Sequence, residues 1–144
     1  MTDSVDARAL NWRFVLPDAE AAEQLVLASE DETLPGAVTV ALAAARRDPA
    51  GVAAFLESAI TEGPYPSVVV GDLTAWSKAL RTRPVPLLTR LADAVRPGGT
   101  VFAGFGNRRC PSRPFAAGTL TLKRAGRALD RAGLTVAQQY VAMP

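Results

Sequence analysis

Apolar and polar residues are arranged along the chain in blocks that predict strands alternating with helices. Short unbroken apolar runs are typical of strands buried on both faces of a parallel sheet. Such runs occupy residues 24–28, 37–42, 67–70 and 100–105, and a last candidate covers residues 134–141. Between several of these runs, apolar residues recur at positions i, i+3, i+4 and i+7, which is the spacing of one helix face.

Three segments carry this helical spacing, at residues 49–60, 86–95 and 121–132. Thr121 is a typical N-cap for the third helix, and Gly133 lies just beyond its expected end. The residues expected to face the core are Val52, Phe55, Leu56 and Ala59 in the first helix, Leu87, Leu88, Leu91 and Val95 in the second, and Leu122, Ala125, Leu129 and Ala132 in the third.

This alternation predicts an α/β domain with a three-layer, Rossmann-like fold, in which helices cover both faces of a shortened, mostly parallel sheet. The expected domain spans residues 24–144 and follows a polar N-terminal arm at residues 1–23. A chain of 144 residues with 49% apolar residues and a net charge of +2 is typical of one compact domain and not of a disordered chain. No run of about 18 apolar residues occurs, and residues 1–8 are polar and acidic, so we expect neither a membrane span nor a secretory signal.

The chain has no histidine and a single cysteine, Cys110. This composition excludes a nucleophile paired with histidine, a zinc site built from cysteine and histidine, and an internal disulfide, so we expect no metal. Cys110 has no histidine to activate it and is expected to be a buried or incidental thiol. A single thiol is consistent with a reducing compartment, so the expected location is the cytoplasm.

Charge is divided unequally between the two parts of the chain. Residues 1–80 contain 12 acidic and 5 basic residues, whereas residues 81–144 contain 2 acidic and 11 basic residues. Two interpretations remain open: the late arginines form an ordinary solvated surface, or they form a cationic face for an anionic peptide, a nucleotide or an acidic partner. Only 6% of the residues are aromatic, so we expect no stacking platform for single-stranded nucleic acid.

Residues 87–141 resemble the C-terminal half of class I S-adenosylmethionine-dependent methyltransferases. The segments that carry the resemblance are LLTRLADAVRPGGTVFAGFGN and TLTLKRAGRALDRAGLTV, in which a helix enters an Arg-Pro-Gly-Gly turn before a strand. Upstream, YPSVVVGDL at residues 65–73 looks like the family's fourth-strand motif. The resemblance implies a Rossmann-like fold, methyl transfer as the reaction and S-adenosylmethionine as the cofactor.

The cofactor-binding part of the family pattern differs in this chain. The family has a glycine-rich turn after its first strand, whereas residues 28–34 contain no glycine and three acidic residues. The family places a carboxylate at the end of its second strand, and residues 41–44 contain none. Its third strand and its last antiparallel strand also have no counterpart in the pattern. We therefore expect no bound cofactor; in a cofactor-binding chain, Ala28, Ser29 and Glu30 would be the contacts.

Two further sites have open interpretations. Asp72 follows a central strand, where it would cap the following turn or, in an active enzyme, act as a base. Asn107, Arg108, Arg109 and Arg113 follow the fifth strand of the family pattern, where they would clamp an anionic substrate or partner, or form a solvated loop. Trp76 is expected to be a lid or interface residue and not to stack on a cofactor.

The expected function is that of a non-catalytic, methyltransferase-like accessory or binding subunit in natural-product biosynthesis. The alternative is a small active S-adenosylmethionine-dependent methyltransferase acting on a small molecule or peptide. A third interpretation is a structural domain whose partner chain supplies the missing glycine loop. Open sheet edges near residues 37–42 and 134–141 predict a second copy or another protein as the partner, and we expect neither nucleic acid nor a membrane as a partner.

Overall fold

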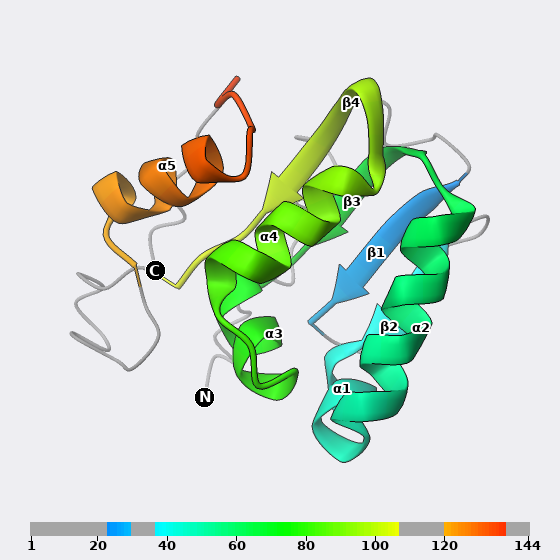
Figure 1. The fold of residues 1–144 in the computed structure, drawn as a ribbon. Helices are drawn as coiled ribbons and strands as arrows, with labels where there is room; N and C mark the ends of the chain where they lie inside the picture. Colours follow the sequence, from blue (N-terminus) through cyan, green and yellow to red (C-terminus); the bar gives the residue numbers. More distant parts are fainter. Residues whose placement is uncertain (1–22, 30–36, 107–119, 138–144) are drawn as a thin grey trace, which may run out of the picture.

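The computed structural model describes residues 23–29, 37–106 and 120–137, and within them the chain forms a four-stranded parallel sheet (Figure 1). The strand order is β2-β1-β3-β4. The strands are β1 (Gln24–Ala28), β2 (Val38–Ala41), β3 (Tyr65–Val70) and β4 (Val95–Ala103). All three pairings are parallel. The predicted α/β class with a parallel sheet is therefore confirmed.

Five helices are described, and their ends follow local sequence signals. They are α1 (Leu42–Arg47), α2 (Pro49–Glu62), α3 (Leu73–Ala79), α4 (Pro84–Asp93) and α5 (Leu122–Arg131). The Asp48 side chain accepts a hydrogen bond of 2.9 Å from the Gly51 N–H and so caps α2. The Thr121 hydroxyl accepts one of 3.3 Å from the Arg124 N–H, which confirms the predicted cap of α5. Gly133, just beyond α5, has a φ of 74°, as a residue after a helix C-cap often does.

The main core lies between one face of the sheet and the helices. Its sheet side is formed by alternate residues, including Leu25, Leu27, Val68 and Val70, and residues of all five helices pack in the same cluster. The topology explains this arrangement. The crossovers from β2 to β3 and from β3 to β4 run in the same direction across the sheet, and right-handed crossovers in one direction place their helices on one face.

The opposite face of the sheet carries a second, smaller cluster of Val26, Ala28 and Val69, with Ala37 and Phe102 at its border. No helix of the described residues packs against these side chains. Within residues 23–29, 37–106 and 120–137 the fold therefore has two layers, one sheet and one layer of helices. The predicted third layer is not found there.

Several predicted element boundaries are corrected by the structure. The second strand ends at Ala41, and residues 42–47 form α1. The Arg-Pro-Gly-Gly segment does not separate a helix from a strand, because residues 96–99 bulge within β4, opposite Pro66. Residues 134–137 are not a strand, and residues 138–141 of that candidate lie outside the described part, as do residues 1–22 of the expected arm.

Three residues predicted to lie on inner helix faces occupy other positions. Phe55 is 46% exposed because it lies about 70° around α2 from the centre of the buried stripe. Leu122 is 54% exposed because it is the first residue of α5, whose buried contacts are made further along by Ala125 and Ala128. Val95 belongs to β4 and not to the preceding helix.

Candidate functional site

The order in which strands are added to the sheet reverses between β1 and β3. From β1 the chain goes to β2 on one side, and from β3 it goes to β4 on the other. In parallel α/β sheets, ligands bind beyond the carboxyl ends of the strands at such a switch point. The residues that follow β1 and β3 here are Ser29, Gly71 and Asp72. In Figure 1 these strand ends point toward α1 and α3. The carboxyl ends of β1 and β3 are therefore the candidate site.

The strand ends meet very closely at the switch point. The Gly71 N–H donates a hydrogen bond of 3.1 Å to the carbonyl of Leu27. A Cβ atom on Gly71 would lie 2.6 Å from the Oγ atom of Ser29, and one on Gly104 would lie 2.0 Å from the carbonyl oxygen of Gly71. The Ser29 hydroxyl therefore occupies the space beside Gly71 where a ligand would have to approach the backbone.

Asp72 is the N-cap of α3. Its Oδ1 atom accepts a hydrogen bond of 3.0 Å from the Ala75 N–H, and its carbonyl accepts one of 3.0 Å from the Trp76 N–H. The carboxylate is thus used to satisfy the first turn of a helix, which is the structural role that Asp plays at many helix starts. The capping interpretation of Asp72 is the one that the hydrogen bonds support.

Trp76 is not a lid or an interface residue, so that prediction is wrong. Its side chain is fully buried in the main core, although its indole N–H has no hydrogen-bond partner among the described residues. α3 presents Leu73 and Trp76, i and i+3, on one face toward the core. The sequence pattern did not distinguish this arrangement from an exposed position because α3 is only seven residues long.

The other predicted site residues are either buried in the sheet or lie outside the described residues. Ala28 is buried in the sheet, and the end of β2 passes from Ala41 directly into α1, where Leu42 is buried. No carboxylate follows β2 at this point. Five residues of the predicted sites lie outside the described residues, namely Glu30, Asn107, Arg108, Arg109 and Arg113, and so does Cys110.

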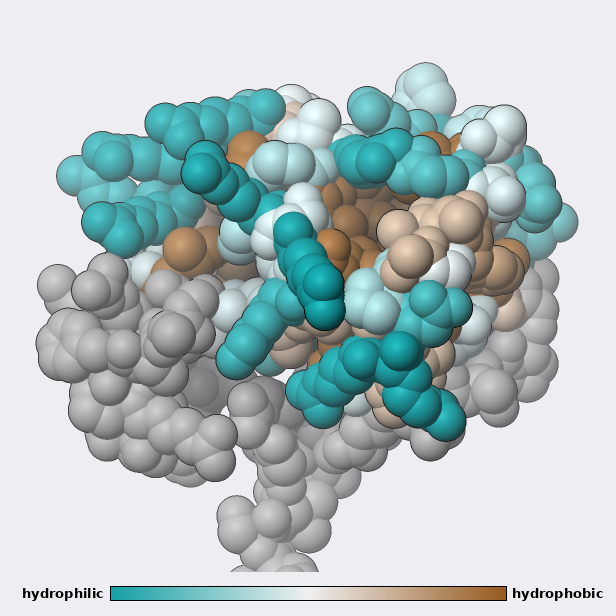
Figure 2. Space-filling model, turned by 60° about the horizontal axis from the view of Figure 1, so that its bottom comes forward, coloured by the Kyte–Doolittle hydropathy of each residue, from teal (hydrophilic) through white to brown (hydrophobic). Residues whose placement is uncertain are grey.

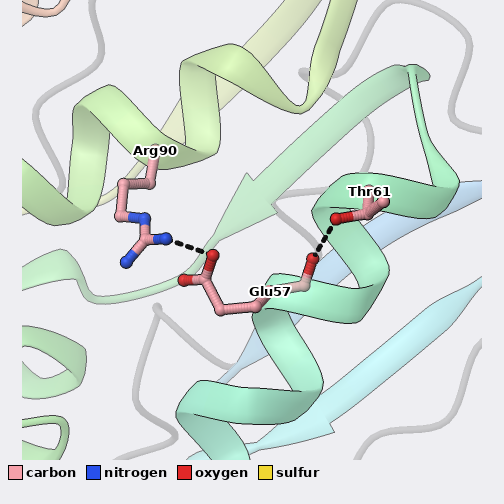
Figure 3. A network of polar contacts seen from close by, with 3 residues as sticks. All are labelled: Glu57, Thr61 and Arg90. Carbon is pink, nitrogen blue, oxygen red and sulfur yellow. Dashed lines mark hydrogen bonds and ion pairs between the residues drawn. The ribbon is translucent and has the colours of Figure 1, made fainter.

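A groove that the sequence analysis missed lies between α2 and α4. Its volume is about 170 Å³. The side chains that line it are Ala53, Leu56, Glu57, Ile60, Leu80, Thr82, Leu87, Arg90 and Leu91. Arg90 of α4 forms an ion pair with Glu57 of α2 across the groove, and the Thr61 hydroxyl donates a hydrogen bond of 2.8 Å to the carbonyl of Glu57 (Figure 3). Helical spacing gave Leu56 and Leu91 as core residues but could not show that two helices leave a gap between them.

Exposed basic residues lie on the helices that follow the carboxyl ends of β2 and β3. Arg46 and Arg47 end α1, and α1 packs against α3, which is followed by Arg81 and Arg83. These four side chains are exposed, as is Lys78 in the last turn of α3. Figure 2, which brings the lower side of Figure 1 forward, shows hydrophilic side chains bordering an apolar area. Exposed basic side chains gathered in this way favour an anionic ligand or partner.

In the part of the chain that the structure describes, His, Cys, Asp and Glu side chains nowhere form a group of three or more that could hold a metal ion. Of the described helices, none combines the length and the apolar character that crossing a membrane requires. Comparisons with protein-family models, with curated proteins and with solved structures found no match for this chain.

Proposed function

We propose that this protein is a non-catalytic, methyltransferase-like accessory or binding subunit, acting in a biosynthetic pathway of the natural-product type. The observation that carries the proposal is the contact between the three strand ends at the switch point. There, the space beside Gly71 is taken by the Ser29 hydroxyl, and Gly104 lies against the Gly71 carbonyl. A nucleoside cofactor that approached the Gly71 backbone from this side would meet the Ser29 hydroxyl.

The likeness to the methyltransferases rests on the sequence segments at residues 65–73 and 87–141, and the sheet order is compatible with it. Binding of S-adenosylmethionine would also need acceptors for the ribose hydroxyls. The second strand offers none, since it ends at Ala41 and is followed at once by a helix. Each missing hydrogen bond would cost about 0.5–1.5 kcal/mol. These differences support binding of a partner over methyl transfer.

The partner in this proposal is a second copy or another protein that covers an open sheet edge. β2 is the edge strand beside β1, and its outer side pairs with no other strand among the described residues. β4 is the opposite edge of the described sheet, a place that the sequence analysis had given to residues 134–141. Unpaired edge strands are commonly covered in native proteins.

Calorimetry with S-adenosylmethionine and with S-adenosylhomocysteine tests the proposal. We expect no binding heat for either compound at millimolar concentration, with circular dichroism showing that the protein is folded. Micromolar binding of either compound would refute the proposal and favour the alternative, an active small methyltransferase. In that case Asp72→Asn would abolish methyl transfer, whereas an unchanged rate would exclude Asp72 as the base.

A further inference from the structure

The groove between α2 and α4 has the composition of a small-ligand site. Leu56, Leu87 and Leu91 form its buried wall, and Ile60 and Leu80 are partly exposed to it. At about 170 Å³ it is smaller than the about 300 Å³ at which drug-sized pockets begin. Such a groove suits one short aliphatic group and not an extended ring system.

Polar side chains also line the groove. Thr82 and Arg90 line the groove and are exposed, and Arg81 and Arg83 flank Thr82 in the chain. Arg81 has a φ of 52° because it follows the C-cap of α3, where the Thr82 N–H donates a hydrogen bond of 2.9 Å to the Ser77 carbonyl.

Among the described residues, Glu57 is the one acidic side chain that lines the groove, and it is paired with Arg90. The side chains of Arg90 and Glu57 are 56% and 47% exposed. Ion pairs with this degree of exposure are weak, so a ligand carboxylate can replace Glu57 as the partner of Arg90. Three described arginines in or beside the groove then outnumber one acidic residue, which favours an anionic ligand group.

We propose that this groove binds a short-chain aliphatic carboxylate, with its hydrocarbon chain against the leucines and its carboxylate on Arg90. Guanidinium groups match carboxylates because they present two parallel N–H donors. The proposal concerns a different place from the switch point and does not depend on whether S-adenosylmethionine binds there. An apolar side chain of a partner protein is the other occupant that the apolar wall would accept, and the experiment below distinguishes the two.

The experiment is a titration of the full-length protein with butanoate, hexanoate and octanoate, followed by calorimetry and by the NMR signals of the leucine methyl groups. We expect about fourfold tighter binding for each added methylene until the groove is full. 1-Octanol is the neutral probe of the same length. We expect octanoate to bind about two- to fivefold more tightly than 1-octanol, because its carboxylate pairs with the exposed Arg90 as a charged acceptor, whereas the alcohol oxygen is a neutral one.

Three variants test the role of charge. Arg90→Gln should weaken octanoate binding about two- to fivefold and change 1-octanol binding less. Glu57→Gln should strengthen octanoate binding, because it releases Arg90 from its ion pair. Arg96→Gln, which removes an exposed arginine from the β4 bulge, is the matched control and should change neither.

The proposal is overturned if octanoate does not shift the signals of the groove leucines, or if Arg90→Gln and Arg96→Gln weaken its binding equally. Equal affinity for octanoate and 1-octanol would also overturn it, and would indicate an apolar side chain as the occupant. Because all three substitutions are at exposed positions, each variant is expected to fold.

Discussion

At the scale of single residues, the contact between Ser29 and Gly71 gives the most direct test of the switch-point geometry. A Cβ atom on Gly71 would lie 2.6 Å from the Ser29 Oγ atom but 3.7 Å from the Ser29 Cβ atom, which is an ordinary contact. Gly71→Ala should therefore lower the free energy of unfolding by about 1 kcal/mol, and Ser29→Ala should restore most of the loss. Urea denaturation of the two single variants and the double variant measures this coupling.

Gly104→Ala is the control for that cycle. Its Cβ atom would meet the backbone oxygen of Gly71 at 2.0 Å, and a backbone atom cannot move aside as a serine hydroxyl can. The loss should be about 1–3 kcal/mol, and it should be the same in the wild-type protein and in the Ser29→Ala background. If Gly71→Ala costs as much in the Ser29→Ala background as in the wild type, the contact described here is not the cause.

Asp72 gives a second prediction, because capping depends on the side-chain oxygen and not on the charge. Asp72→Ala removes the acceptor of the Ala75 N–H and should destabilise the protein by about 1 kcal/mol, whereas Asp72→Asn keeps an acceptor and should be nearly neutral. Thermal unfolding of both variants measures the difference. Equal losses for the two substitutions would show that the charge matters more than the cap.

Cap residues such as Thr121 and Asp72 were predictable from sequence, because each acts on a backbone group three residues away. The positions of Trp76, Phe55 and Leu122 were not. Whether an apolar side chain on a helix is buried depends on what the rest of the chain places beside it. Trp76 is buried because α3 lies inside the layer formed with α1 and α4, and no local pattern contains that information.

At the scale of elements, the strands at residues 24–28 and 67–70 and the helix at 49–60 were predicted closely, since each has a strong pattern and clear end signals. Errors arose where pairing overrides local preference or where the pattern is weak; the helix α3 was also missed, and residues 134–137 are not the predicted strand. Residues 96–99 read as a turn but lie within β4, because Val95 and Thr100 on either side both pair with β3. The Ala-rich segment after β2 has no apolar period, so its helix α1 was missed.

Among the described helices, α4 should contribute most to stability for its length. Leu88 and Leu91 are fully buried against the sheet, and α4 contacts α3, α5 and β4. Leu88→Ala should lower the free energy of unfolding by about 2–5 kcal/mol. Leu122→Ala, at the exposed start of α5, is the matched control and should change it by less than about 0.5 kcal/mol. Denaturant unfolding of both variants checks the expectation, and similar losses would contradict the core described here.

At the scale of the whole molecule, folding rearranges the charges that the sequence separated by position. The basic residues Arg46 and Arg47 come from the acidic part of the chain, yet α1 carries them to the side of the sheet where Arg81 and Arg83 lie. Exposed acidic residues lie just before the starts of three strands: Glu23 before β1, Glu62 before β3 and Asp93 before β4. They are therefore near the amino ends of the strands, at the other end of the sheet from these arginines. Charge counts along the chain could not reveal this division, because it follows from the direction of the parallel strands.

Tyr65, at the start of β3, lies near these acidic residues and makes stability depend on pH. Its side chain is 7% exposed. Burial, and to a smaller extent the nearby charge of Glu62, raises the pKa of Tyr65 above its ordinary value of 10.0. Below that value the phenol is protonated in both the folded and unfolded states, so pH has no effect through this group. Above it, the unfolded state loses the proton first, and the folded state becomes less stable as pH rises.

Stability measured by urea denaturation between about pH 8 and pH 11 should therefore fall more steeply in the wild-type protein than in Tyr65→Phe, which has no phenol to ionise. All other ionisable groups are the same in the two proteins, so the difference between the curves reports on Tyr65. Glu62→Gln should give an intermediate slope, because it removes the smaller cause of the pKa shift and leaves the burial. Parallel curves for the wild type and Tyr65→Phe would show that the phenol is accessible to water in solution, and that β3 does not start inside the core as described.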